Sequence, residues 1–469
     1  MKQLHDAGAS LKRKVAGGYG AEIRRLLSLG LPVLVTQVGI IVVSFADTMM
    51  VGAYGLDELA AAAFVNNIFM VAIVMQIGFA AGMTPLVGAL YGRGEKREAG
   101  RMMRAGLQLN ALVSLGFTAI MGTIFFFLDH FGQDPELLPL IRSYYLIILC
   151  TLLPMSVFNC CQQTANATTD TATPMWIILA GDVLNIGGNW LLIFGHWGCP
   201  ELGLTGAGIS TLVTRVLSAL AILAVIRLRR RYRPYYEGAL QPAGASLRRE
   251  MWTTSYPVMI QNGVECGLWS LGAITSGWFG KVQLAAYQVI NTISQLGFMT
   301  YISFGVATSV RVANCTGARD VEGIQRSAAA GMRINIVLAT AASLLFIFAT
   351  RQLVHLFSPD EGVTASAVTL IVPLVIYQYL DAAQLTYANA LRGTSEVKPL
   401  LWISLVSYIA VGIPLMMCLA VVADMGNVGV YYSFTGALLC AALLFRAAFR
   451  RAARRKESEF AAVAGLKKV

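Results

Sequence analysis

Long apolar runs separated by short polar segments occupy most of the chain. A membrane-spanning helix needs about 20 mostly apolar residues, and twelve runs reach this length. Their limits are 26–54, 58–90, 103–128, 140–163, 172–195, 205–227, 250–279, 283–312, 329–350, 364–391, 398–421 and 428–449. The pattern predicts an all-α polytopic membrane protein with twelve transmembrane helices.

The composition agrees with this prediction. Of the 469 residues, 56% are hydrophobic and only 13% are charged, and the mean hydropathy is +0.63. Soluble domains carry about 25% charged residues. An ordinary soluble protein is therefore excluded.

The net charge of +11 first suggests a polyanionic partner. However, the basic residues collect in both tails and in every second loop, as cytoplasmic segments do. They lie mainly in 12–25, 93–104, 227–249 and 446–468, whereas 57–58, 129–136 and 360–361 are acidic. We therefore expect a multi-pass protein of the inner membrane with both termini cytoplasmic, and no nucleic-acid partner.

The chain also contains an internal duplication. A shift of 225 positions superimposes residues that have specific backbone or polar requirements. The matched pairs are Pro32 with Pro257, Gly52 with Gly277, Phe79 with Phe304, Arg101 with Arg326, Asn110 with Asn335 and Pro174 with Pro399. Six spans in each half predict two lobes, 1–235 and 236–469, related by a parallel repeat with a pseudo-two-fold axis along the membrane normal. Secondary transporters move such lobes against each other.

Polar residues within the first-lobe runs indicate a site. Asp182, Asn185 and Asn189 are three and four positions apart, so they share one face of a helix. Asp47, deep in the first run, is their expected facing partner. A charged side chain at bilayer depth costs about 2.5–3.5 kcal/mol on insertion scales, and such residues usually line an ion or substrate path.

Two further polar residues have an open role. Gln162 in the fourth run and Thr211 in the sixth could complete the first-lobe cluster. They could equally hold helices together, because amide and hydroxyl side chains often form hydrogen bonds across membrane helices.

The second lobe contains a different set of acids. Glu265 lies in the seventh run, and Tyr377 and Asp381 lie four apart on one face of the tenth. Hard cations bind oxygen ligands, and two close carboxylates repel each other until a cation or a proton arrives. These three residues predict a cation-coupling site that holds Na⁺ or a shared proton. Because Glu265 aligns with Ile40 and not with Asp47, the two lobes have diverged.

No catalytic motif competes with these sites. The chain has no His-Glu-x-x-His, no Gly-x-Ser-x-Gly and no phosphate loop ending in Gly-Lys-Ser/Thr. We therefore expect no enzyme activity, no ATP-driven transport and no cofactor other than Na⁺ or H⁺ as the coupling ion.

The chain resembles the multidrug and toxic compound extrusion (MATE) family, in particular its NorM-like branch. The resemblance covers all twelve runs. It depends on Pro32 followed by Asp47, on the segments Ala-Thr-Thr-Asp-Thr-Ala-Thr-Pro at 167–174 and Leu-Asn-Ile-Gly-Gly-Asn-Trp-Leu-Leu-Ile-Phe-Gly at 184–195, and on Glu265, Tyr377 and Asp381.

The resemblance implies an antiporter, a monomer in the lipid membrane, that exports cationic or zwitterionic aromatic drugs in exchange for Na⁺ or H⁺. It places Asp47, Asn185 and Asn189 in the first-lobe cavity, and Glu265, Tyr377 and Asp381 in the second-lobe cation site. Many relatives carry Asp where this chain has Asn189, and Asp182 has no counterpart in the family pattern. These departures favour a second-lobe cation site, with Asp47 able to take up a proton.

Other functions stay open at this stage. A flippase for lipid-linked saccharides, from the same wider superfamily, would need a basic cavity, and Arg215 is the clear mid-span basic residue. A channel is also compatible with the pattern. A membrane-embedded prenyl transferase would need Asp-rich motifs that the chain lacks.

Overall fold

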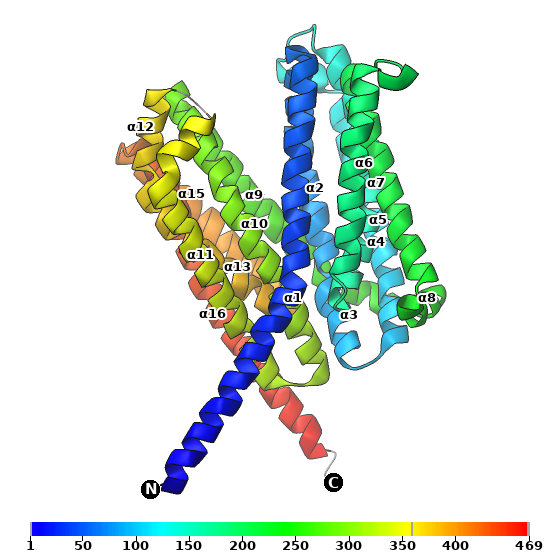
Figure 1. The fold of residues 1–469 in the computed structure, drawn as a ribbon, viewed down its shortest axis with the longest axis vertical. Helices are drawn as coiled ribbons and strands as arrows, with labels where there is room; N and C mark the ends of the chain where they lie inside the picture. The colour runs from blue at the N-terminus through cyan, green and yellow to red at the C-terminus, as the bar shows by residue number, and fades with distance from the viewer. Residues whose placement is uncertain (1, 358–359, 467–469) are drawn as a thin grey trace. The chain divides into compact units, whose positions relative to one another are not determined.

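The computed structural model describes residues 2–357 and 360–466, with side chains at 18–355 and 360–462. The topology prediction also depends on basic residues, such as Lys12 and Lys468, whose side chains lie outside these ranges. The described chain is helical and contains no strand (Figure 1). The first half contains α1 (Lys2–Tyr54), α2 (Leu56–Ala81), α3 (Met83–Gly92), α4 (Lys96–Phe125), α5 (Leu138–Ala167), α6 (Ala172–Phe194), α7 (Gly203–Leu228) and α8 (Arg233–Leu240), with short 3₁₀ turns η1 (Leu128–Phe131), η2 (His196–Gly198) and η3 (Arg230–Tyr232).

The second half repeats this plan. It contains α9 (Ala245–Trp278), α10 (Lys281–Ala318), α11 (Val321–Phe357), α12 (Glu361–Thr369), α13 (Ile371–Gly393), α14 (Lys398–Ser404), η4 (Leu405–Gly412), α15 (Ile413–Met416), η5 (Met417–Val422) and α16 (Gly426–Leu466). Every predicted apolar run lies on one of these helices or on a consecutive group of them. The all-α prediction is confirmed.

Ten helical segments among the described residues are long and apolar enough to cross a membrane, and the bent pair α12 and α13 (52°) makes an eleventh. The seventh predicted span lies on α9, which has 34 residues but is not among these eleven. Gln261, Asn262 and Glu265 in the middle of α9 lower its hydropathy. The same polar residues make this helix a candidate for function.

The chain forms two compact units that do not coincide with its two sequence halves. One unit comprises Val35–Gly263, and the other comprises the chain up to Leu34 together with Val264–Val469. The chain thus passes from one unit to the other inside α1 and again inside α9. The matched prolines Pro32 and Pro257 lie inside these two helices, shortly before each crossing. The predicted lobes, 1–235 and 236–469, remain a prediction about the repeat.

In the Val35–Gly263 unit, glycines let α2 and α3 approach the first part of α9 closely. A Cβ on Gly82 would lie 2.7 Å from the Cα of Ser255, and one on Gly78 would lie 3.0 Å from the Cα of Met259. The Phe79 ring packs on Trp252, with their centroids 5.6 Å apart. Backbone contact of this kind is how membrane helices associate without a hydrophobic driving force.

In the other unit, the first part of α1 packs on α10 in a related way. A Cβ on Gly30 would lie 2.5 Å from the Phe304 ring, and Phe304 is the repeat partner of Phe79. Leu26 and Leu29 are buried against Val310 and its apolar neighbours. The beginning of α1 therefore belongs to the unit formed mostly by the second half of the chain. The beginning of α9 belongs to the unit formed mostly by the first half.

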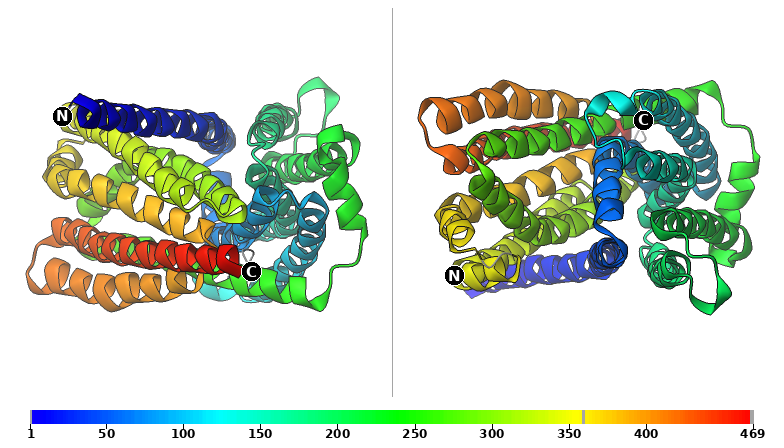
Figure 2. Two further views of the ribbon diagram at one scale, coloured as in Figure 1. Left: turned by 90° about the horizontal axis from the view of Figure 1, so that it is seen from below. Right: turned by 90° about the horizontal axis from the view of Figure 1, so that it is seen from above.

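The core of the Val35–Gly263 unit consists of two apolar clusters at different heights along α5, α6 and α7, which run side by side (Figures 1 and 2). On α7, the cluster with Leu204 and Ala207 lies near the beginning, and the cluster with Ala219 and Ile222 lies farther along. Between the two clusters, α1, α6 and α7 carry polar residues that bond to one another. This polar layer contains the first-lobe candidates.

Candidate functional site

The first polar cluster joins α1, α6 and α7. The Nδ2 of Asn189 donates a hydrogen bond to Oδ1 of Asp47 at 2.5 Å. Asn189 is fully buried, and Asp47 is half-buried. Asp47 therefore faces Asn189, the arrangement expected for this cluster.

One turn earlier on α6, Asn185 bonds to α7. Its Nδ2 donates to Thr211 Oγ1 at 3.3 Å, and Ser210 Oγ donates to the Asn185 carbonyl at 2.9 Å. The side-chain oxygens of Asn185 and Asn189 are buried and accept no hydrogen bond within the described chain. These unpaired acceptors leave the layer able to bind a donor or a cation.

Asp182 lies one turn before Asn185 on α6, against the α1 backbone. A Cβ on Gly39 would come within 2.6 Å of its Oδ2, which is buried without a partner among the described residues. Asp182 is close enough to Asp47 for their charges to repel. Asp182 thus belongs to the same layer as Asp47.

Gln162 does not join this cluster. It is half-buried on α5, and no hydrogen bond links it to the other first-lobe candidates in the described structure. Sequence reasoning instead missed the role of Arg215, which it weighed only as a feature of a flippase. Arg215 donates to Thr151 Oγ1 at 2.5 Å, and its positive charge acts on Asp47.

The second polar cluster joins α9, α13 and η4 in the other unit. Asp381 on α13 is 1% exposed, and neither of its carboxylate oxygens has a hydrogen-bond partner in the described chain. Glu265 on α9 also has one buried oxygen without a partner, and its charge acts on Asp381. The two carboxylates therefore form one electrostatic site.

Aromatic rings surround these carboxylates. Tyr377, one turn before Asp381, is buried and meets the Trp269 ring edge-to-face at 5.5 Å between centroids. The charges of both Asp381 and Glu265 act on the Tyr377 phenol. The three residues predicted for a cation site are thus brought together.

Sequence reasoning missed a buried cation near this cluster. Arg392, at the end of α13, is 9% exposed, and its Nη1 donates to Asn389 Oδ1 at 3.3 Å. Its charge acts on Glu265, although no ion pair within 4.0 Å forms in the described chain. In sequence, Arg392 looks like one more basic residue at a span end, so no signal distinguishes it.

The chemistry of this donor set suits a small monovalent cation. Two carboxylates and a phenol oxygen are hard ligands, and a carboxylate buried without a partner is costly until a proton or cation neutralises it. Among the described residues, no group of three or more His, Cys, Asp or Glu forms a metal cluster. Transition metals prefer nitrogen and sulfur ligands, whereas carboxylate and phenol oxygens suit hard cations.

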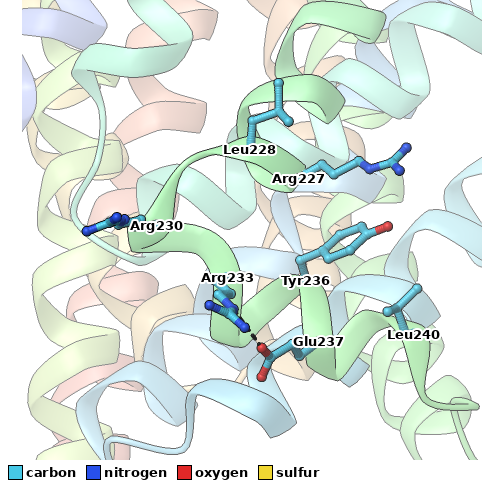
Figure 3. Close-up of a pocket in the computed structure, with 7 residues that line it drawn as sticks. All are labelled: Arg227, Leu228, Arg230, Arg233, Tyr236, Glu237 and Leu240. Carbon is cyan, nitrogen blue, oxygen red and sulfur yellow. Dashed lines mark hydrogen bonds and ion pairs between the residues drawn. The ribbon is translucent and has the colours of Figure 1, made fainter.

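A surface pocket at the end of α7 is separate from both clusters. It is lined by Arg227, Leu228, Arg230, Arg233, Tyr236, Glu237 and Leu240 (Figure 3). Arg233 donates to Glu237 at 3.0 Å. The pocket contains none of the predicted site residues.

The MatE family profile matches residues 32–191 and again 257–418. The chain belongs to the MatE family. The two matches begin at Pro32 and Pro257, the prolines that the repeat aligns. This family comprises the multidrug efflux transporters related to NorM, which are multi-pass membrane proteins.

Known relatives and solved structures are similar to this chain over most of its length. The chain is 27% identical to the multidrug resistance protein NorM of Aliivibrio fischeri, across 91% of this chain and 94% of that protein. It is 28% identical to a probable multidrug resistance protein NorM of Bradyrhizobium diazoefficiens, across 92% and 94%. Its fold is similar to a eukaryotic MATE transporter (TM-score 0.83, 19% identity, 94% and 100% covered) and to a Vibrio cholerae MATE transporter (TM-score 0.81, 17% identity, 93% and 98%).

Proposed function

We propose that this MatE chain is a cation-coupled multidrug antiporter. It exports cationic or zwitterionic aromatic compounds by alternating access between two lobes, and it takes up Na⁺ or H⁺ in exchange. The relatives named NorM support the drug substrates, because they are multidrug resistance proteins. We further propose a monomer in the inner membrane with both termini cytoplasmic.

One observation carries the coupling proposal: the Asp381 carboxylate is buried without a hydrogen-bond partner in the described chain, beside a second carboxylate, Glu265. An uncompensated buried charge is unfavourable by several kcal/mol. A proton or Na⁺ bound by Glu265, Asp381 and Tyr377 removes this penalty. Release of the ion restores the negative charge, which attracts a cationic drug.

The first-lobe layer supports a complementary role in drug binding. Asp47 and Asp182 supply negative charge, and the unpaired acceptors of Asn185 and Asn189 can receive hydrogen bonds from a drug. Thr211 orients Asn185 and acts indirectly. Gln162 stays a candidate wall residue without a contact to support it.

Arg215 favours the alternative, a lipid-linked saccharide flippase, because it places a positive charge in the first-lobe layer. An anionic substrate needs net positive charge, yet Arg215 shares its layer with Asp47 and Asp182. The layer as a whole is therefore not basic. This favours a cationic substrate.

A transport assay tests the proposal directly. The purified protein is reconstituted in liposomes, and the liposomes are loaded with a fluorescent aromatic cation. Na⁺ and pH gradients are then imposed separately. We expect at least one gradient to drive the dye against its own concentration gradient. If neither drives uphill transport, the antiporter proposal is wrong, and movement of a lipid-linked saccharide would favour the flippase.

A further inference from the structure

The eleventh predicted span departs from regular α-helix beside the second cluster. Between α14 and α15 the backbone forms a π-helix, η4, over Leu405–Gly412. π-helices account for well under 1% of residues and occur frequently at functional sites. Pro414 explains the widened turns, because it lacks an N–H and its ring clashes with the carbonyl of residue i−4, Ala410.

The π-helix carries Tyr408, whose phenol bonds to α13. Nε2 of Gln384 donates to Tyr408 Oη at 3.0 Å, and both side chains are buried, with exposures of 0% for Gln384 and 1% for Tyr408. Tyr408 accepts this bond, so its own hydroxyl hydrogen and a lone pair stay available. The neighbouring Ser407 Oγ and the Gln384 amide oxygen are buried without partners in the described chain.

This hydroxyl belongs to the surroundings of the two carboxylates. Gln384 follows Asp381 by three residues on α13, so both lie on one face of that helix. The charges of Glu265 and Asp381 both act on the Tyr408 phenol. Tyr408 thus faces the acidic pair from a third helix, whereas Tyr377 shares a helix with Asp381.

We propose that Tyr408 supplies a further neutral oxygen to the cation site of Glu265 and Asp381, and that Gln384 positions it. The inference rests on the proposed antiport function and deepens it. A metal cation is held by several oxygen ligands, whereas a proton needs one carboxylate oxygen. Tyr408 therefore favours Na⁺ over H⁺ at this site.

The test compares the Na⁺ response of Tyr408→Phe with that of the wild type. This change keeps the ring and removes only the hydroxyl. We expect the half-saturating Na⁺ concentration, measured by thermal stabilisation of the purified protein and by dye efflux, to rise about tenfold, as loss of one ligand to a charged site would give. Maximal efflux at saturating Na⁺ is measured alongside, so that weaker Na⁺ binding is distinguished from a loss of folded protein.

Tyr145→Phe is the matched control. Tyr145 is also fully buried, and its Oη donates to the Met121 carbonyl at 2.7 Å, but it belongs to the Val35–Gly263 unit. This variant shows how much stability and efflux change when a buried tyrosine hydroxyl is removed away from the cation site. Its half-saturating Na⁺ concentration should match that of the wild type.

Gln384→Met tests the positioning role. It should raise the half-saturating Na⁺ concentration less than Tyr408→Phe does, and the double variant should be no worse than Tyr408→Phe alone. If Tyr408→Phe does not fold, Gln384→Met carries the test, because it leaves the phenol but removes its donor.

The outcomes separate this inference from the function on which it rests. An unchanged Na⁺ response in Tyr408→Phe, or in Gln384→Met where that variant carries the test, overturns the inference. Wild-type efflux that responds to pH alone also overturns it, while the antiport proposal stands. Wild-type efflux that responds to neither gradient removes both.

Discussion

Arg311 of α10 binds both carboxylate oxygens of Glu22 on α1, with N–O distances of 2.8 and 3.0 Å. Ser327 of α11 adds a third hydrogen bond at 2.7 Å, and Glu22 is only 5% exposed. The paired geometry and the additional donor compensate the cost of burying these charges. Glu22 therefore fixes the first part of α1 to α10 and α11, before the chain passes to the other unit beyond Leu34.

Removing this anchor should destabilise the protein. Glu22→Gln leaves Arg311 without a negatively charged partner, which should lower the free energy of unfolding by about 3 kcal/mol. Arg25→Gln is the control, because Arg25 is 63% exposed and contacts the same carboxylate at 3.3 Å. It should cost less than about 1 kcal/mol. Equal thermal shifts for the two variants would show that the buried pair is not an anchor.

The charge of Asp47 should be needed for drug efflux. Asp47→Asn keeps an oxygen that can accept from Asn189 Nδ2, so packing is preserved while the negative charge is lost. We expect at least about a tenfold drop in dye efflux, equivalent to about 1.4 kcal/mol, with normal protein levels in the membrane. Asp57→Asn, at an exposed position at the beginning of α2, is the control. Normal efflux from Asp47→Asn would reduce Asp47 to a scaffold residue.

The segment after α7 should make stability sensitive to alkaline pH. Burial, together with the hydrogen bond to Asp170 at 2.7 Å, raises the pKa of Tyr232. Up to about pH 10, the ordinary tyrosine pKa, folded and unfolded chains both keep the proton, and the stabilisation is complete. Above it, the unfolded chain releases its proton first, so stability falls as pH rises.

Thermal melts between about pH 9 and 11 test this dependence. Tyr232→Phe should reduce the loss of stability over this range. Asp170→Asn should reduce this loss to a smaller extent, because it removes the Asp170 negative charge that raises the Tyr232 pKa. Wild-type and Tyr232→Phe proteins with the same pH profile would contradict the assignment.

Arg392 should weaken cation binding in the second cluster. Its positive charge acts on Glu265 and opposes a second cation there. Arg392→Gln should therefore lower the half-saturating Na⁺ concentration by about tenfold, as an unfavourable interaction of about 1.4 kcal/mol would give. The direction is opposite to that expected for Tyr408→Phe. An increase, or the same response as the exposed control Arg351→Gln, would exclude this electrostatic role.

The helical architecture was predictable because length and hydropathy determine what can span a membrane. The duplication was visible because Pro32 and Pro257 are residues that backbone geometry restricts. The sequence did not predict that the beginnings of α1 and α9 each belong to a different unit from the rest of their helix. This arrangement depends on close packing at Gly30 and Gly82, which composition does not reveal. Glu22 likewise looked like one charge of a polar tail.

For the candidate sites, helical spacing grouped Asn185 with Asn189 and Tyr377 with Asp381, and the position of Asp47 inside an apolar run made it the expected partner of this group, which the hydrogen bond to Asn189 matches. It could not identify Tyr408 or Arg392. Tyr408 reaches α13 from a π-helix, and a 3.6-residue period assigns no face to such a segment. Arg392 is distinguished only by its burial, which one sequence does not encode for a basic residue at a helix end.

Gradient-driven efflux by Asp381→Asn tests the central claim most directly. Wild-type protein, Asp381→Asn, Glu265→Gln and the exposed control Glu322→Gln are reconstituted at equal density, and uphill transport of a fluorescent cation is followed under imposed Na⁺ and pH gradients. The account predicts that both site variants lose gradient-driven efflux, whereas Glu322→Gln retains it. Wild-type rates from Asp381→Asn and Glu265→Gln would contradict a coupling site at these carboxylates.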